Sequence, residues 1–128
     1  MPVPILKQGP ILIASVQAAL TDSDAERLRH DLMDQVGTHR ALGIVVDVTA
    51  IDVMDSFAAR SLRTIAHMTR LRGAETVIVG VQPEVAFAMV QLGLKFDGMH
   101  TALDLEEGLA LLNNRLARSQ SIGHHDAR

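Results

Sequence analysis

The sequence predicts an α/β domain with a mixed, mostly parallel β-sheet of about four to five strands covered by about four helices. Short apolar runs bounded by turn residues alternate with segments of helical period, which is typical of this class. The chain has 128 residues, 48% of them hydrophobic, and this suffices for the core of one domain. We expect a single domain over 1–117 and a disordered tail over 118–128.

Four apolar segments predict the strands. Runs without polar alternation are typical of strands that are buried on both faces of a sheet. Three such runs lie at residues 11–16, 44–48 and 76–80. Ile5 and Leu6 stand ahead of a glycine-proline turn, so they predict an edge strand that forms an N-terminal hairpin.

Capping residues and apolar periodicity predict the helices. Ser23 is expected to cap the first helix, and the glutamate three residues later completes a capping box. The second helix follows Ser56 and is expected to stop at Gly73 in a left-handed conformation. Pro83 suits the first turn of the third helix, and Asp104 begins the last. The positions expected to face the core are Ala25, Leu28, Leu32 and Val36 in the first helix, Val85, Met89 and Leu92 in the third, and Leu105, Leu109, Leu112 and Leu116 in the last.

Composition excludes several classes of function. The chain has no cysteine, so disulfides and thiolate metal sites are impossible. A net charge of -3 and an aromatic content of 2% argue against nucleic-acid binding. The N-terminus does not resemble a signal peptide, and no apolar stretch is long enough to span a membrane. We therefore expect a cytoplasmic protein that binds neither nucleic acid nor membrane.

The segment most informative about function is 44–60, in which a buried strand runs through a short acidic loop into a helix. In α/β sheets, ligands and modifications commonly lie at the carboxyl ends of strands and at the adjacent helix N-termini. Asp47, Asp52, Asp55 and Ser56 are expected there. Ser56 has two interpretations. Its hydroxyl could simply cap the helix, or it could be a phosphorylation site, because a helix N-terminus favours an added anion.

Basic side chains are predicted to follow Ser56 along the same helix. A phosphate on Ser56 would be repelled by Asp52 and Asp55, so phosphorylation would change this surface strongly. The basic stripe could be a solvated face or a surface that binds a partner. The candidate partner contacts are Phe57, Arg60, Arg63, His67 and Arg70.

No catalytic, cofactor-binding or metal-binding residue is predicted. Asp47 lacks the acidic pair and the late lysine that would support a receiver, and a threonine stands two positions after it, where a haloacid-type phosphatase would need a second aspartate. Ser56 lacks the glycine frame of a nucleophile elbow. The acidic loop could in principle hold a hard cation, but such loops are more often simply solvated. A small-molecule or nucleotide binder remains an alternative, although no glycine-rich loop is present to hold phosphates.

The segment from Val46 to Ser56 resembles the signature of STAS domains, the fold of anti-sigma factor antagonists. The resemblance extends from about Ile5 to Leu116. In that family the serine of an Asp-Ser pair is phosphorylated by a dedicated serine kinase, and here the pair is Asp55-Ser56. The resemblance therefore implies that Ser56 is the phosphorylated residue.

Many antagonists follow the Asp-Ser pair with Ser-Gly-Leu, whereas this chain has Phe57-Ala58-Ala59-Arg60, as in the RsbS type of stressosome component. That resemblance implies a non-enzymatic scaffold that forms homo- or hetero-oligomers with sensory, RsbR-like co-antagonists. It also implies sequestration of an RsbT-like switch kinase, release after phosphorylation of Ser56, and reversal by an RsbX-like phosphatase. The alternative is a soluble antagonist that binds an anti-sigma kinase directly without forming a scaffold.

Overall fold

The computed structural model describes the backbone of residues 3–93 and 98–126, and the side chains as far as 118. A five-stranded sheet with the order β1-β2-β3-β4-β5 forms the centre of the protein. The strand β1 is antiparallel to β2, and the remaining pairs are parallel. The strands are β1 (Ile5–Gln8), β2 (Ile11–Ser15), β3 (Gly43–Asp47), β4 (Glu75–Val79) and β5 (His100–Ala102).

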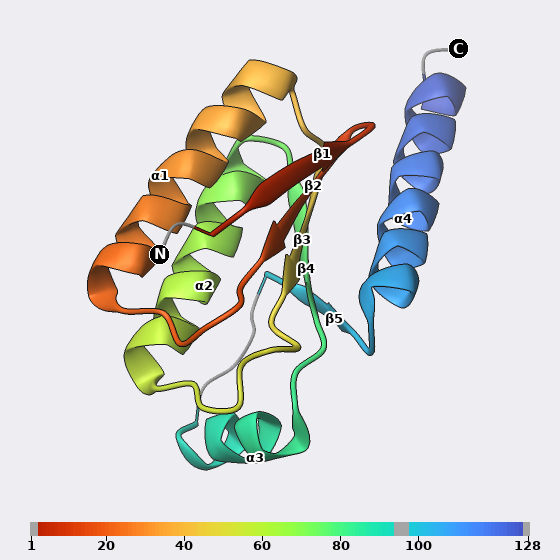
Figure 1. The fold of residues 1–128 in the computed structure, drawn as a ribbon. Coiled ribbons are helices and arrows are strands. Elements are labelled where there is room, and N and C mark those ends of the chain that lie inside the picture. The colour runs from red at the N-terminus through yellow and green to blue at the C-terminus, as the bar shows by residue number, and fades with distance from the viewer. Residues whose placement is uncertain (1–2, 94–97, 127–128) are drawn as a thin grey trace.

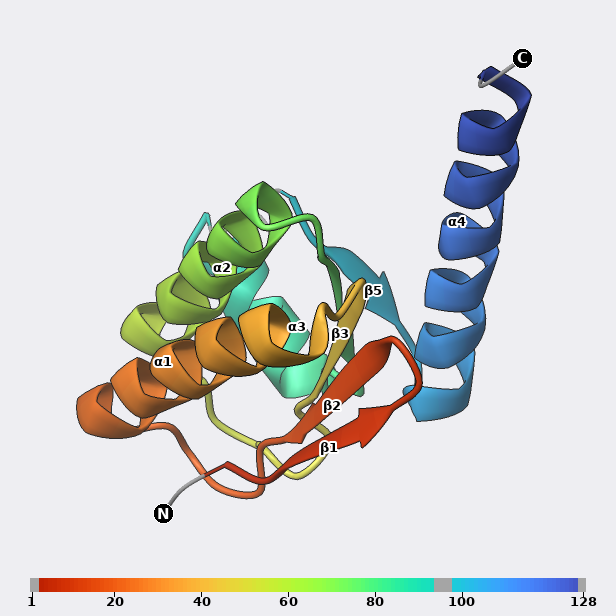
Figure 2. The ribbon, with the colours of Figure 1, turned by 90° about the horizontal axis from the view of Figure 1, so that it is seen from above.

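Four helices accompany the sheet within the described residues: α1 (Asp22–His39), α2 (Ser56–Leu71), α3 (Pro83–Gln91) and α4 (Leu105–Asp126). Figures 1 and 2 show α1 and α2 side by side on one face of the sheet and α4 on the opposite face. The short helix α3 lies beyond the carboxyl ends of the parallel strands, close to the loop that leads into α2 (Figure 1). The predicted α/β class, with a mixed and mostly parallel sheet, is confirmed.

Each central strand is buried on both faces, as its continuous apolar sequence predicts. In β3, Ile44 and Val46 belong to the core beneath α1 and α2, whereas Val45 belongs to the core beneath α4. The side chains of β4 are divided between the two cores in the same way, because successive side chains of a strand point to opposite faces of the sheet. The sheet therefore separates two apolar clusters, and the one beneath α4 is the smaller.

A buried pair of hydroxyl groups joins α2 to the sheet. Thr69 and Thr76 have exposed fractions of 0% and 1%, and their Oγ1 atoms lie 3.1 Å apart. If the Thr76 hydroxyl donates to the Thr69 hydroxyl, the Thr69 hydroxyl can donate its own proton to the Ala66 carbonyl, which lies 3.0 Å away. These contacts satisfy two polar groups that would otherwise cost free energy inside the core.

The residue that caps the start of α1 differs from the predicted one. Thr21, not Ser23, is the N-cap: its Oγ1 accepts a hydrogen bond from the Asp24 amide, and Asp24 bonds back to the Thr21 amide. The predicted capping box was therefore two residues too late. Bonding to Thr21 lowers the pKa of the Asp24 carboxyl. Both threonine and serine are common helix caps, and serine is slightly preferred, so residue type alone favoured the wrong register.

Two further details depart from the sequence prediction. Strand β5 was not located, because its three residues contain no apolar run and none of their side chains is fully buried. Leu92 follows α3 as its C-cap and is 54% exposed, so it does not face the core. The backbone of α4 continues to Asp126. The domain boundary at 117 and the disordered tail from 118 stay predictions.

Helix α4 packs against the sheet through a small residue and a leucine. A Cβ atom at Gly108 would lie 2.5 Å from Cγ1 of Val79, so glycine permits the close approach of this helix. Leu112 is fully buried, as predicted, and Gly43 of β3 leaves room for it. The other three leucines predicted to face the core from this helix are half-buried: Leu105, Leu109 and Leu116.

An ion pair also joins α4 to the sheet. Nε of Arg115 lies 3.0 and 2.8 Å from the two carboxylate oxygens of Glu75, and Nη2 lies 2.8 Å from Oε1. His100 of β5 approaches the same carboxylate, with Nε2 at 3.5 Å from Oε1. The Arg115 hydrogen bonds lower the pKa of the Glu75 carboxyl, although partial burial opposes this shift. Glu75 therefore connects β4, β5 and α4.

We expect this ion pair to make stability depend on pH in the acid range. A carboxyl whose pKa is lowered by folding stabilises the protein above its unfolded pKa, and this contribution is lost as pH falls below about 4.5. Because both side chains are partly exposed, the contribution at neutral pH should be under about 1 kcal/mol. Urea denaturation of the parent, E75Q and R115Q proteins between pH 7 and pH 3 measures it. An R115Q protein that kept the full pH dependence of the parent would contradict this assignment.

Candidate functional site

The acidic segment between β3 and α2 begins with a hydrogen-bonded turn. One carboxylate oxygen of Asp47 accepts from the Thr49 amide at 2.9 Å and from the Thr49 hydroxyl at 2.6 Å. Asp47 is half-buried at the end of β3. Its carboxylate therefore holds the first turn of the loop.

The connection between β4 and α3 holds the same loop from the other side. Nε2 of Gln82 donates to the Thr49 carbonyl at 2.7 Å, and the Val48 amide donates to the Val79 carbonyl at 3.0 Å. Gly80 has a φ of 77°, and a Cβ atom there would collide with Oγ1 of Thr49. Glycine therefore serves both the backbone conformation and the close approach of the two connections.

Two apolar side chains anchor the loop in the core. Ile51 and Met54 are 3% and 6% exposed, and both belong to the cluster beneath α1 and α2. Between them, Asp52 and Val53 are exposed. The loop thus has a fixed path and presents Asp52 on its outer side.

Asp55, and not Ser56, is the N-cap of α2. Its Oδ1 accepts a hydrogen bond from the Ala58 amide at 2.8 Å, and its backbone is extended. Ser56 is the first residue of the helix. The interpretation of Ser56 as the helix cap is therefore wrong, because the neighbouring carboxylate already fills that role. The Ser56 hydroxyl is not needed to hold the start of the helix.

The Ser56 side chain is half-buried and contacts an arginine one helical turn later. Nη2 of Arg60 donates to Oγ of Ser56 at 3.3 Å, and Nε donates to the Ser56 carbonyl at the same distance. A separation of 3.3 Å is long for a hydrogen bond to a neutral hydroxyl, so the contact is weak. It nevertheless places a permanent positive charge beside the candidate switch residue.

The other predicted partner contacts follow α2 away from Ser56. His67 and Arg70 are exposed, Arg63 is half-buried, and Phe57 is 40% exposed. The side chain of Arg60 is the member of the predicted stripe that the structure brings to Ser56. Among the described residues, Asp47 and Asp55 bond to nearby groups of the loop and helix start rather than to the Ser56 hydroxyl.

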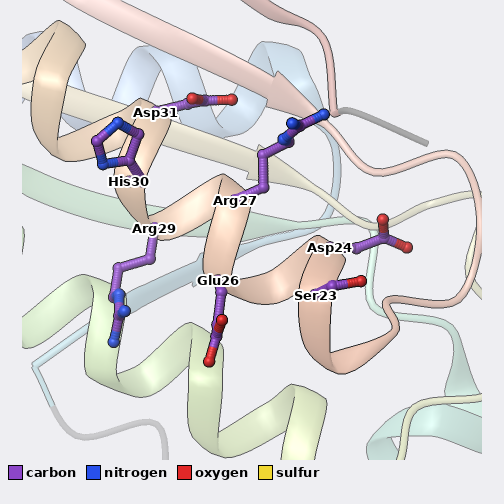
Figure 3. Close-up of a pocket in the computed structure, with 7 residues that line it drawn as sticks. All are labelled: Ser23, Asp24, Glu26, Arg27, Arg29, His30 and Asp31. Atoms are coloured by element: carbon purple, nitrogen blue, oxygen red, sulfur yellow. The ribbon is translucent and has the colours of Figure 1, made fainter.

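A groove of about 350 Å³ runs between α1 and α2 beside this helix start. Figure 3 shows Glu26 and Arg29 pointing from α1 toward α2, whereas Arg27 and Asp31 point to the other side of α1. The sequence did not place Glu26 and Arg29 beside α2, because the two helices meet only in the fold. The residues that line the groove are Ala25, Glu26 and Arg29 of α1 and Phe57, Arg60, Ser61 and Thr64 of α2.

Several large apolar side chains are exposed at the end of the molecule where α3 lies. The loop and the start of α2 contribute Val53 and Phe57, which are 69% and 40% exposed. Helix α3 contributes Phe87 and Val90, which are 64% and 77% exposed. Figure 1 shows that these segments share one end of the molecule. Exposed aromatic and aliphatic side chains of this kind are typical of surfaces that bind other proteins.

Two negative findings apply to the part of the chain that the structure describes. No group of three histidine or acidic side chains there is placed to hold a metal ion. No helix within those residues is long and apolar enough to cross a membrane.

Residues 3–108 match the family model described as STAS domain, so the chain belongs to the STAS domain family. It is also similar to two RsbT co-antagonist proteins of Bacillus subtilis. RsbRA is 26% identical over 99 residues, which are 77% of this chain and 36% of RsbRA. RsbRD is 28% identical over 86 residues, which are 67% of this chain and 31% of RsbRD. The chain thus spans about a third of the length of these relatives.

Solved structures give a similarity over nearly the whole chain. A serine-to-glutamate variant of RsbS from Moorella thermoacetica is 34% identical, with a TM-score of 0.77, and the match covers 91% of this chain and 97% of that one. A chain from the stressosome, described as a signal integration and transduction hub, is 32% identical, with a TM-score of 0.74 and coverage of 90% and 99%. These similarities confirm the predicted resemblance to the RsbS type of STAS protein.

The anti-sigma factor antagonist SpoIIAA, in its unphosphorylated form, shares the fold alone. Its identity to this chain is 12%, with a TM-score of 0.65 and coverage of 88% of this chain and 97% of that one. The same layering of helices and sheet thus persists where little of the sequence is shared.

We expect the contact between Gly80 and Thr49 to be essential for the path of the loop. G80A combines a left-handed backbone with a collision, whereas G73A has a φ of 87° but nothing within 4 Å of the added Cβ. G73A should therefore cost about 1–2 kcal/mol in the free energy of unfolding. G80A should cost at least about 1 kcal/mol more, because the collision adds to the backbone strain. Urea denaturation measures both, and equal losses would show that the collision is relieved without cost.

Proposed function

We propose that this protein is a non-enzymatic antagonist of the stressosome type, whose binding of a switch serine kinase is controlled by phosphorylation of Ser56. The observation that carries the proposal is the position of Ser56. It is the first residue of α2, half-exposed, and relieved of the capping role by Asp55. A phosphate can be added to this hydroxyl without removing a bond that holds the loop or the helix start.

Electrostatics supports a switch at this position. The first turn of a helix has amide groups without intrahelical acceptors, and its dipole favours negative charge. A phosphate adds a charge of about -1.5 to -2 at neutral pH. Asp52 and Asp55 already carry negative charge on the same loop and helix start. A partner that docks there would have to desolvate the added anion, so phosphorylation would weaken binding.

The partners of similar proteins support the identity of the kinase. The RsbR relatives are named as co-antagonists of RsbT, and RsbS is among the similar solved structures. We infer that this chain assembles with RsbR-like STAS proteins into a hetero-oligomer in the cytoplasm. The assembly would sequester an RsbT-like kinase and release it after phosphorylation of Ser56. An RsbX-like phosphatase would remove the phosphate and restore sequestration.

The exposed apolar side chains near Ser56 support a protein partner. Val53, Phe57 and Phe87 lie on the loop, on α2 and on α3, and all are substantially exposed. Burial of such side chains at an interface contributes binding free energy, and aromatic residues commonly dominate it. A surface that combines these side chains with the basic residues of α2 fits a protein better than a small molecule.

We expect an RsbT-like kinase with ATP to modify the parent protein and S61A but not S56A. Ser61 is a suitable control because it is half-buried on the same helix and close to Ser56. Mass spectrometry of the intact protein and of its peptides measures the phosphate and its position. Equal incorporation into S56A and the parent would disprove the role of Ser56.

The alternative is a soluble antagonist that binds an anti-sigma kinase directly. Light scattering of the protein mixed with an RsbR-like partner separates the two. We expect a large hetero-oligomer, in keeping with the similarity to a stressosome chain. A persistent monomer or dimer in the mixture would favour the alternative.

A further inference from the structure

We propose that the guanidinium group of Arg60 binds the phosphate of phosphorylated Ser56. The proposal rests on the proposed phosphorylation of Ser56 and assigns the internal cation that binds that phosphate. It gives Arg60 a role in the modified state, in addition to its place among the candidate partner contacts.

The first step is the existing contact between Arg60 and Ser56. Nη2 of Arg60 already lies 3.3 Å from Oγ of Ser56. The hydroxyl is a weak, neutral acceptor, but a phosphate places anionic oxygens beyond Oγ. Guanidinium groups bind such oxygens through short, charge-assisted and often bidentate hydrogen bonds. An anion four residues before a cation is also the favourable order along a helix.

The second step is the charge around Ser56. Asp52 and Asp55 lie on the same loop and helix start and oppose the phosphate, but Oδ1 of Asp55 is already bonded to the Ala58 amide. Arg60 is the cation that the structure brings to the Ser56 hydroxyl. Its guanidinium group therefore offsets the negative charge that a phosphate would add there.

The consequence is that one modification changes the surface twice. Phosphorylation adds an anion at the start of α2, and the bonded phosphate also withdraws Arg60 from any partner. Both changes occur at side chains, and Arg60 is exposed, so neither requires α1 or α2 to move. A partner that relies on the Arg60 charge would lose it in the phosphorylated protein.

The test uses the full chain with phosphoserine introduced at position 56 during translation, so no kinase is required. A phosphorus NMR titration reports the second ionisation of the phosphate. We expect R60Q to raise its midpoint by roughly half a pH unit relative to the parent, because the dianion loses a bonded cation. R70Q is the matched control, because Arg70 is exposed on the same helix but several turns away.

An R60Q midpoint equal to that of the parent would overturn the proposal, as would an equal rise in R70Q, which would indicate a general effect of net charge. Circular dichroism checks that each variant is folded, and R60K should restore part of the shift if charge at position 60 is the cause. The kinase experiment on S56A can fail independently, since it concerns which residue the kinase modifies.

Discussion

The burial of β3 on both faces is the constraint on which the site depends. Ile44 and Val46 have exposed fractions of 0% and 1% beneath α1 and α2, and Val45 is 0% exposed beneath α4. A slip of one residue would exchange the two faces, so the packing fixes the register of this strand. The fixed register places Asp47 at the end of the strand, where its carboxylate can close the first turn of the loop.

From that turn onward, each contact limits the next one. Gln82 and Gly80 hold Thr49, while Ile51 and Met54 enter the core. These anchors leave Asp55 to cap α2, and the residue after it is then presented at the helix start. The chemistry of the site therefore depends on ordinary structural roles of the acidic residues. Two of the three predicted members of the phosphosite environment, Asp47 and Asp55, serve as hydrogen-bond acceptors for the local backbone.

Most of the fold could be predicted from the sequence because its strands are continuous apolar runs and its helices have clear apolar stripes. The failures occurred where local signals were ambiguous or absent. Thr21 and Ser23 are both of a type that caps helices, and β5 is a strand because it pairs with β4, not because its residues favour one. The site was predicted as a segment, but the groove beside it was not, because Glu26 and Arg29 come from a helix that is distant in sequence. Such contacts depend on packing and leave no pattern in the sequence.

The same division of roles explains how phosphorylation could act without unfolding. The loop and the helix start are held by Asp47, Asp55 and Gln82, whereas the hydroxyl of Ser56 bonds to the side chain of Arg60. Replacing that weak bond by a stronger one changes surface charge and leaves the anchors in place. If Ser56 were itself the cap, the same phosphate would replace a structural bond. Placing the cap one residue earlier therefore separates the stability of the helix from the state of the switch.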